Sequence, residues 1–368
     1  MRVRSVFFAG GGTGGHIYPA LAVAEKIAEM SGDTRIHFFC SQRQIDSSIL
    51  SKTDFEFTAL PAIGLCGNPV GAVKFLKGFY DSYKIAKRKI AEADDAVVVA
   101  VGGFVAGPVG YAAKRLGVSL KLINVDIVPG KANKLLSRWA DEAFLQYEET
   151  VGFFAKKGVK THVVGCPLRS GFDGQCQGGI REELGLDKNK KILLVTGASS
   201  GAVNINNAVC ASLENMSRFA DDWQIVHLTG AVNFDTVAAK YRQAKIENKV
   251  LGYFDDMGRL LKEADIVIGR SGAVSVAEFE AAGAAVICMP YPHHKDRHQY
   301  LNAAKLVDAG AAVIVDDVAD ETDRAERLWD ELSELMGDSD RLRQMKKCAE
   351  KLAGKKAAKK IAENILAM

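Results

Sequence analysis

Short apolar runs alternate with amphipathic stretches along most of this chain, and this alternation constrains its fold more than any other feature. Strands are expected over Val3–Ala9, Ile36–Cys40, Ala96–Val101, Leu120–Val125, Ala143–Gln146, His162–Val164, Ile192–Thr196, Gln224–Leu228, Val250–Tyr253, Ile266–Gly269, Ala285–Met289 and Ala312–Val315. Helical patterns between them include Ala20–Met30, Asn204–Phe219, Val274–Ala282 and Gln299–Ala309. Apolar strands separated by helices predict an α/β fold with parallel sheets covered on both faces.

The strands fall into two series, which predicts two doubly wound, Rossmann-like domains. Each series opens with a strand that runs into a glycine-rich turn, at Gly10–His16 and again at Gly197–Ala202. A chain of 368 residues also exceeds the size at which one core stops growing. We expect a first domain over 1–165 and a second over 166–345. One long basic helix is expected over Asp340–Met368, and its part 346–368 is expected to return to the first domain.

Composition excludes several other classes of protein. No stretch of about 18 uncharged apolar residues is present, so no transmembrane helix is expected. The N-terminus lacks the layout of a signal peptide. Seven scattered cysteines without a CxxC spacing are typical of the reducing cytosol, and they argue against a disulfide framework or a structural zinc site. We therefore expect a cytoplasmic protein.

Positive charge is concentrated in two segments, although the whole chain carries only +3. Residues 341–368 hold nine Lys or Arg and two Glu, and Lys74–Lys89 holds six Lys or Arg and one Asp. The second segment also contains four aromatic residues, Phe75, Phe79, Tyr80 and Tyr83. It is either a solvated surface helix or a helix that lies on an anionic membrane. Nucleic acid is not expected as a partner, because no recognition motif is present.

The glycine-rich turns place backbone N–H groups and a helix N-terminus together, an arrangement that binds phosphates and other anions. Facing turns on two domains suggest one ligand in a cleft between them. Gly10, Gly12 and Gly15 formally match the dinucleotide fingerprint. However, the second strand ends at Phe38–Arg43 without the acidic residue of that fingerprint, which disfavours a nicotinamide cofactor. Arg43 would suit the 2′-phosphate of NADP, so this cofactor is disfavoured rather than excluded. No Gly-Lys-Ser/Thr follows the loop, so a P-loop is excluded.

His16 directly follows the first turn and opens a helix. A histidine with a pKa near ~6.5 can act as a general base at neutral pH. The alternative is a histidine that caps the helix or contacts a phosphate. A third cluster, Gly102–Pro108, follows another strand of the first domain and points to the same site.

In the second domain, Gly269–Glu278 reads as a strand, a Ser-Gly turn and a helix, which is again an anion site. Glu278 either accepts hydrogen bonds from sugar hydroxyls or is an ordinary surface glutamate. In the following segment, His294 and His298 have a spacing that could bind a metal on a helix. No third ligand is evident and Lys295 and Arg297 add repulsion, so neither a metal nor another cofactor is expected.

Four motifs together resemble the MurG family of UDP-N-acetylglucosamine transferases, in glycosyltransferase family 28. They are Gly11–His16 followed by Pro19-Ala20, Gly102–Pro108, Arg270–Glu278, and Asp296–Gln299 with Asn302-Ala303. The resemblance implies the GT-B fold and metal-independent, inverting transfer of N-acetylglucosamine from UDP-GlcNAc. The acceptor would be the 4-hydroxyl of the muramoyl sugar in undecaprenyl-diphospho-MurNAc-pentapeptide (lipid I), which gives lipid II for peptidoglycan synthesis.

The resemblance also implies roles for individual residues. His16 would deprotonate the acceptor hydroxyl, with Thr13, Gly14 and Gly15 near the donor sugar or its phosphates. The other implied contacts are Arg169 and Ser199 to the diphosphate, Phe254 and Ala273, Val274 and Ser275 to the uracil, Glu278 to the ribose and Gln299 to the N-acetylglucosamine hydroxyls.

The chain departs from the family pattern at several of these places. Asn124–Ile127 replaces His-Glu-x-Asn, and it places Asp126 among the substrate-binding candidates. His298 stands where the family tends to have glutamine, and it too is a substrate-binding candidate. Further differences are Ala198, Ser200 and Val203 in the third loop, and Cys166 before Pro167.

These departures leave three alternatives open. They are a related GT-B transferase acting on another lipid such as diacylglycerol, a UDP-N-acetylglucosamine 2-epimerase, and a nucleotide-sugar-binding protein without turnover. A lipid-linked acceptor would require peripheral docking on the inner face of the cell membrane. The basic segment Val73–Ile90 lies where the family has its apolar and basic patch, which favours the membrane interpretation of that segment.

Overall fold

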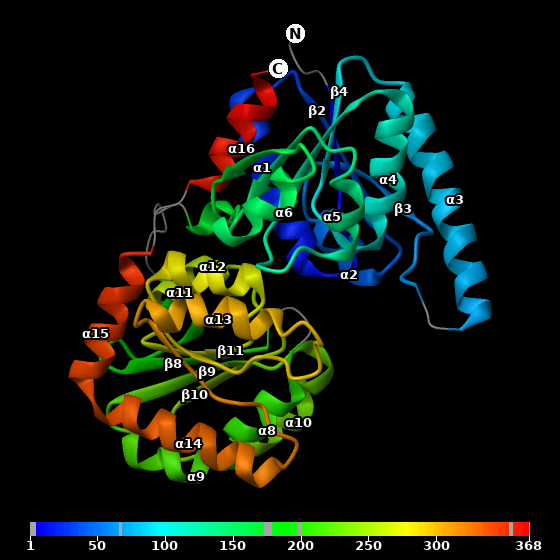
Figure 1. Ribbon diagram of the computed structural model, residues 1–368. Coiled ribbons are helices and arrows are strands. Elements are labelled where there is room, and N and C mark those ends of the chain that lie inside the picture. Colours follow the sequence, from blue (N-terminus) through cyan, green and yellow to red (C-terminus); the bar gives the residue numbers. More distant parts are fainter. Residues whose placement is uncertain (1–4, 66–67, 173–178, 198–200, 353–355, 368) are drawn as a thin grey trace. The chain divides into compact units, whose positions relative to one another are not determined.

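The computed structural model describes residues 5–65, 68–172, 179–197, 201–352 and 356–367. The chain divides into two compact units, residues 1–169 with 355–368 and residues 170–354. Each unit is an α/β domain built on a parallel sheet (Figure 1).

In the described part of the first unit, seven parallel strands pair in the order β3-β2-β1-β4-β5-β6-β7. The strands are β1 (Ser5–Ala9), β2 (Arg35–Ser41), β3 (Glu56–Leu60), β4 (Ala96–Ala100), β5 (Ser119–Asn124), β6 (Glu142–Leu145) and β7 (Lys160–Val163). The helices are α1 (Gly14–Met30), α2 (Gln44–Leu50), α3 (Pro69–Ala91), α4 (Gly103–Leu116), α5 (Lys131–Leu136), α6 (Val151–Ala155) and α16 (Ala357–Leu366).

In the described part of the second unit, six parallel strands pair in the order β10-β9-β8-β11-β12-β13. They are β8 (Lys191–Thr196), β9 (Trp223–Leu228), β10 (Asn248–Leu251), β11 (Ile266–Gly269), β12 (Ala285–Cys288) and β13 (Ala312–Ile314). The helices are α7 (Ile180–Leu184), α8 (Val203–Ala211), α9 (Leu213–Met216), α10 (Phe234–Tyr241), α11 (Met257–Glu263), α12 (Ala273–Ala282), α13 (His298–Asp308), α14 (Glu321–Gly337) and α15 (Ser339–Glu350).

Both sheets are buried between helices, as the apolar strand composition requires. In the second unit, α11, α12 and α13 cover one face, and α8, α9, α10 and α14 cover the other (Figure 1). The central strands are fully buried: Val97–Ala100 of β4 and Ile266–Ile268 of β11 are at most 2% exposed. The predicted fold class, two Rossmann-like parallel-sheet domains, is confirmed.

All twelve predicted strands are present, and the described residues contain one more. Strand β3 was not expected, because its first residues, Glu56 and Phe57, are exposed. It lies at the edge of the sheet beside β2, where a short strand needs no continuous apolar run.

The expectation of one long C-terminal helix from Asp340 to Met368 is wrong, because α15 ends at Glu350 and α16 begins at Ala357. The intervening sequence contains Gly354, a residue that is unfavourable in a helix interior. Helix α15 belongs to the second unit, whereas α16 belongs to the first and packs beside α1 (Figure 1).

A buried ion pair ties α16 to the first sheet. The Lys121 ammonium donates to Glu142 at 2.8 Å and to the Asn364 side chain of α16 at 2.9 Å. Burial alone would raise the pKa of Glu142, but hydrogen bonds from Lys121 and His162 outweigh that effect and lower the pKa to about 2. The charged form of Glu142 therefore helps to hold α16 in place.

Across the described residues, no helix is both long and apolar enough to cross a membrane.

Candidate functional site

The first glycine loop, Gly10–Gly12, is held by a buried carboxylate from α2. The Gly12 N–H donates to Asp46 Oδ1 and Oδ2 at 3.0 and 2.8 Å, and the Ser41 N–H and hydroxyl donate to Oδ2 at 2.8 and 2.6 Å. Gly12 has φ +89°, and a Cβ on Gly11 would lie 2.4 Å from Asp46 Oδ2. Both glycines are therefore required for the loop to close over this carboxylate.

Arg43 fixes the other side of the same loop. Its guanidinium donates to the Gly12 carbonyl at 2.9 Å and lies 5.3 Å from the centroid of the Phe104 ring on α4. The loop thus has an internal anion at the Gly12 N–H and an internal cation at the Gly12 carbonyl. Asp46 was not a sequence candidate, because only folding brings α2 to the loop. Arg43 was considered only as a contact for the 2′-phosphate of NADP, whereas here it binds the Gly12 carbonyl.

His16 lies where the first glycine turn (Gly10–His16) meets the cluster Gly102–Pro108. Its Nδ1 is 3.2 Å from the Thr13 hydroxyl. Its ring faces Gly102 and Gly103, where an added Cβ would lie 2.8 Å from His16 Cδ2 and 3.3 Å from Nδ1 respectively. Gly102 and Gly103 have φ +137° and +74°, and these backbone conformations beside the His16 ring favour glycine. Gly102 and Gly103 therefore lie directly beside His16 within this unit.

The environment of His16 favours a neutral imidazole. Burial lowers its pKa below the usual 6.5, and the charge of Asp126, a hydrogen bond with the Gly11 backbone and the charge of Asp46 oppose this in decreasing order. A histidine that is neutral at pH 7 can accept a proton. The position is therefore suited to a general base.

Asp126 is held near His16 by a pair of asparagines. The buried side chain of Asn124 donates to the Asp126 carbonyl at 2.8 Å, and Asn133 of α5 donates to Asn124 Oδ1 at 3.2 Å and to the Ile123 carbonyl at 3.1 Å. The segment that departs from the family pattern is thus fixed by hydrogen bonds within it and from Asn133 on α5.

The remaining candidates of the first unit are Thr13, Gly14 and Gly15 at the start of α1, and Arg169. Thr13 caps α1 through its backbone, and Gly14 and Gly15 form the first turn. The guanidinium carbon of Arg169 lies 4.0 Å from the centroid of the Tyr18 ring on α1, within the range of a cation–π contact. Ser199 of the second unit lies outside the described residues.

In the second unit, most candidates follow β11. Arg270, Ser271 and Gly272 link that strand to α12, whose first turn contains Ala273, Val274 and Ser275. Glu278 lies on the same helix and is half-buried. Phe254, also half-buried, lies between β10 and α11. These residues share the carboxyl edge of the sheet, where ligands of open α/β sheets bind.

Gln299 and His298 open α13. Gln299 Oε1 accepts a hydrogen bond from the Tyr291 N–H at 2.9 Å, which connects the helix to the segment after β12. His298 Nδ1 lies 2.7 Å from Asp296, and this hydrogen bond is the main cause of the lowered pKa of Asp296. The ring of His298 stacks on that of His294, with centroids 4.3 Å apart.

That stacking is unlike a shared metal site, where two imidazoles would direct nitrogens at one point. Among the residues with described positions, no group of three or more His, Cys, Asp or Glu could hold a metal ion.

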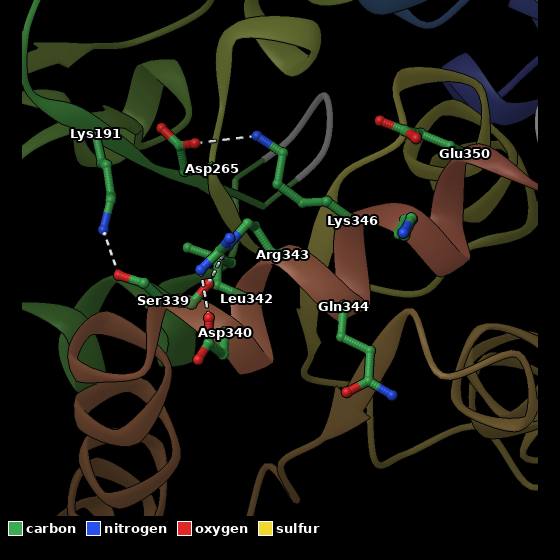
Figure 2. Close-up of a pocket in the computed structure, with 10 residues that line it drawn as sticks. Lys191, Asp265, Ser339, Asp340, Leu342, Arg343, Gln344, Lys346 and Glu350 are labelled. Atoms are coloured by element: carbon green, nitrogen blue, oxygen red, sulfur yellow. Dashed lines mark hydrogen bonds and ion pairs between the residues drawn. The ribbon is translucent and has the colours of Figure 1, made fainter.

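A separate cavity lies at the opposite edge of the second sheet (Figure 2). It is lined by α15 and by Lys191 and Asp265, which stand at the amino ends of β8 and β11. Figure 2 shows Lys346 directed at Asp265 and Lys191 at Ser339, at 3.0 and 3.1 Å. Since the candidates above lie at the carboxyl ends of the strands, this cavity is not part of their site.

Two parallel-sheet α/β domains with glycine loops at strand ends have the architecture of the GT-B fold. The chain belongs to glycosyltransferase family 28: residues 6–145 match the family's N-terminal domain and residues 192–365 match its C-terminal domain. The family resemblance inferred from the motifs is thereby confirmed.

Relatives match over nearly the whole chain. Proteins of Alkaliphilus metalliredigens and Myxococcus xanthus are 31% and 32% identical, over 99% and 97% of this chain and 99% and 91% of their own lengths. Both are named UDP-N-acetylglucosamine--N-acetylmuramyl-(pentapeptide) pyrophosphoryl-undecaprenol N-acetylglucosamine transferase.

Solved structures agree with this fold. MurG of Acinetobacter baumannii covers 100% of both chains with a TM-score of 0.74 and 25% identity. A putative UDP-N-acetylglucosamine 2-epimerase of Listeria monocytogenes has a TM-score of 0.72 but only 15% identity, over 99% of this chain and 96% of its own. The second similarity concerns the fold alone.

Proposed function

We propose that this chain transfers N-acetylglucosamine from UDP-GlcNAc to the 4-hydroxyl of the muramoyl sugar of undecaprenyl-diphospho-MurNAc-pentapeptide, with inversion at the anomeric carbon. The main support is the similarity over almost the full length to transferases named for this reaction. His16 supports the proposal further, because the reaction needs a base and this histidine lies beside two glycine clusters.

In this proposal the acceptor hydroxyl loses its proton to His16 as its oxygen attacks the anomeric carbon of the donor. The bond between that carbon and the diphosphate breaks, and UDP leaves. His16 is suited to the proton transfer because burial keeps it neutral near pH 7. We assign the transfer to Nε2, because Nδ1 contacts the Thr13 hydroxyl.

The donor nucleotide is assigned to the carboxyl edge of the second sheet. The N-terminus of α12 offers the N–H groups of Ala273, Val274 and Ser275, and Glu278 follows one turn later on the same helix. A carboxylate near a sugar accepts hydrogen bonds from its hydroxyls, which suits the ribose. We assign Phe254 to the uracil, Gln299 and His298 to the N-acetylglucosamine, and Arg169 and Ser199 to the diphosphate.

A departing diphosphate can be stabilised without a metal ion. Helix N-termini and guanidinium groups interact favourably with negative charge as it develops. We therefore propose that UDP leaves against the positive end of a helix and Arg169, with no divalent cation required.

The acceptor is lipid-linked, and α3 has the surface that a membrane would need. Val70, Val73, Leu76 and Tyr80 are each more than half exposed, at spacings that place them on one side of the helix. Lys74, Lys77 and Lys84 are exposed on the same side. An apolar row bordered by lysines is typical of helices that lie on anionic bilayers. We infer that α3 docks the chain peripherally on such a membrane.

The experiment that tests the function compares donor turnover with and without a lipid I analogue. Transfer predicts UDP release only when the analogue is present. An epimerase would instead form a new UDP-sugar without an acceptor, and a binding protein would release no UDP.

A further inference from the structure

Asp317 carries a fully buried carboxylate just beyond the carboxyl end of β13. Its Oδ1 accepts from Arg324 Nε at 2.7 Å and from the Asn204 side chain at 2.8 Å. Its Oδ2 lies 2.7 Å from Arg270 Nη2 and 3.1 Å from the same Asn204 nitrogen. A buried carboxylate is stable only when it is paired and hydrogen-bonded, and this one has both kinds of partner.

The three partners come from different parts of the donor edge. Asn204 lies in the first turn of α8, after β8, and Arg270 lies between β11 and α12. Arg270 also donates to the carbonyls of Met289 and Pro290, after β12, at 2.8 and 3.2 Å. One carboxylate thus connects the carboxyl ends of β8, β11, β12 and β13.

Arg324 of α14 fixes the carboxylate itself. Besides Asp317, its guanidinium donates to the carbonyls of Val318 and Ala319 at 2.6 and 3.2 Å. The segment 317–319 is therefore held as a unit against α14. Arg270 and Arg324 together carry two positive charges against the single negative charge of Asp317, so the cluster is formally cationic at the edge where we place the UDP diphosphate.

We propose that Asp317 is a positioning residue of the donor site, which holds the loop before α12 and the start of α8 in one fixed arrangement for the nucleotide diphosphate. This inference rests on the function proposed above. Asp317 acts through Arg270 and Asn204 and contributes to donor affinity, whereas His16 performs the proton transfer. Loss of the Asp317 carboxylate should therefore change nucleotide binding more than it changes turnover at saturating donor.

The test measures UDP binding by calorimetry, and KM and kcat for UDP-GlcNAc, on Asp317→Asn in the full chain. Loss of a charged hydrogen-bonding partner predicts weaker UDP binding and a higher KM by about tenfold or more, with kcat within about threefold of wild type. The matched control is Asp323→Asn, which removes a half-exposed carboxylate six residues later and should bind UDP as wild type does.

A second variant keeps the proposal testable should Asp317→Asn not fold. Asn204→Ala removes only the link to α8 and leaves both arginines paired with Asp317. It should weaken UDP binding by about threefold or more and lower the unfolding temperature less than Asp317→Asn does, because both arginines still pair with the carboxylate. Unchanged UDP binding in the folded variants, or a fall in kcat alone, would overturn the positioning role. Wild-type protein that binds no UDP would overturn the proposed function instead.

Discussion

The Asp46 carboxylate accepts the Gly12 N–H through both of its oxygens, at 3.0 and 2.8 Å. In a dinucleotide- or phosphate-binding loop, N–H groups at this point face the ligand. Here the protein supplies its own anion, so the Gly12 N–H is already occupied. We therefore infer that this loop positions His16 and does not bind a phosphate through the Gly12 N–H.

Asp46→Asn should loosen this loop. The amide retains a similar shape but has one acceptor oxygen for the three groups that now donate to the carboxylate, Gly12 N–H and the Ser41 N–H and hydroxyl. We expect a loss of about 1–3 kcal/mol in the free energy of unfolding and a fall in kcat of about tenfold or more, measured by denaturant unfolding and steady-state kinetics. Asp54→Asn, an exposed carboxylate eight residues later, should change neither value.

His16→Ala should abolish transfer while the protein still binds UDP-GlcNAc. Removing a general base typically costs about 10²–10⁴ in rate, whereas the donor residues proposed above lie elsewhere in the chain. Isothermal calorimetry and a UDP-release assay would separate the two effects. Full activity in this variant would remove His16 from the mechanism.

The pH dependence tests the charge environment of His16. Burial is the main cause of its pKa lying below 6.5, so the midpoint of the acidic limb of kcat/KM should also lie below pH 6.5. Asp126 opposes that shift because its negative charge raises the pKa of His16. In Asp126→Asn the pKa of His16 should fall further, and the acidic limb should move to lower pH. Movement to higher pH would contradict this arrangement, and Asp54→Asn should leave the limb in place.

Glu278→Ala should weaken nucleotide binding without preventing folding. The side chain is half-buried on α12 and is proposed to accept hydrogen bonds from the ribose. Loss of such charged hydrogen bonds predicts UDP affinity lower by about tenfold or more. Glu280→Ala on the same helix is the control. If uridine diphosphate bound both variants as tightly as wild type, the ribose assignment would be wrong.

Membrane docking by α3 can be tested with vesicles that contain anionic lipid. Changing Lys74, Lys77, Lys84 and Lys87 to Gln removes four charges worth about 1 kcal/mol each near such a surface, so binding should fall by at least about a hundredfold. Gln substitutions at Lys188, Lys240, Lys245 and Lys351, which are exposed elsewhere, provide the control. Equal vesicle binding by both sets would exclude α3 as the docking surface.

Much of the fold was predictable because strands in parallel sheets are buried on both faces and are apolar throughout. Strand β3 escaped prediction because it is an edge strand with exposed Glu56 and Phe57. The separation of α15 from α16 also escaped, since the basic pattern continues through both helices.

The candidate site was predictable where its residues are neighbours in the sequence. His16 directly follows its glycine loop, and Glu278 shares a helix with Ala273–Ser275. By contrast, Asp46 is 34 residues from Gly12 and Asp317 is 113 residues from Asn204. Neither carboxylate has a local signal, because each becomes a partner only when strands and helices assemble.

The most direct test of the proposed transfer is UDP release from UDP-GlcNAc in metal-free buffer, with and without a lipid I analogue. We predict release that depends on the analogue and persists without divalent cations, with a product that carries N-acetylglucosamine on the muramoyl 4-hydroxyl. Bound donor without UDP release in the presence of the analogue would contradict the transferase function.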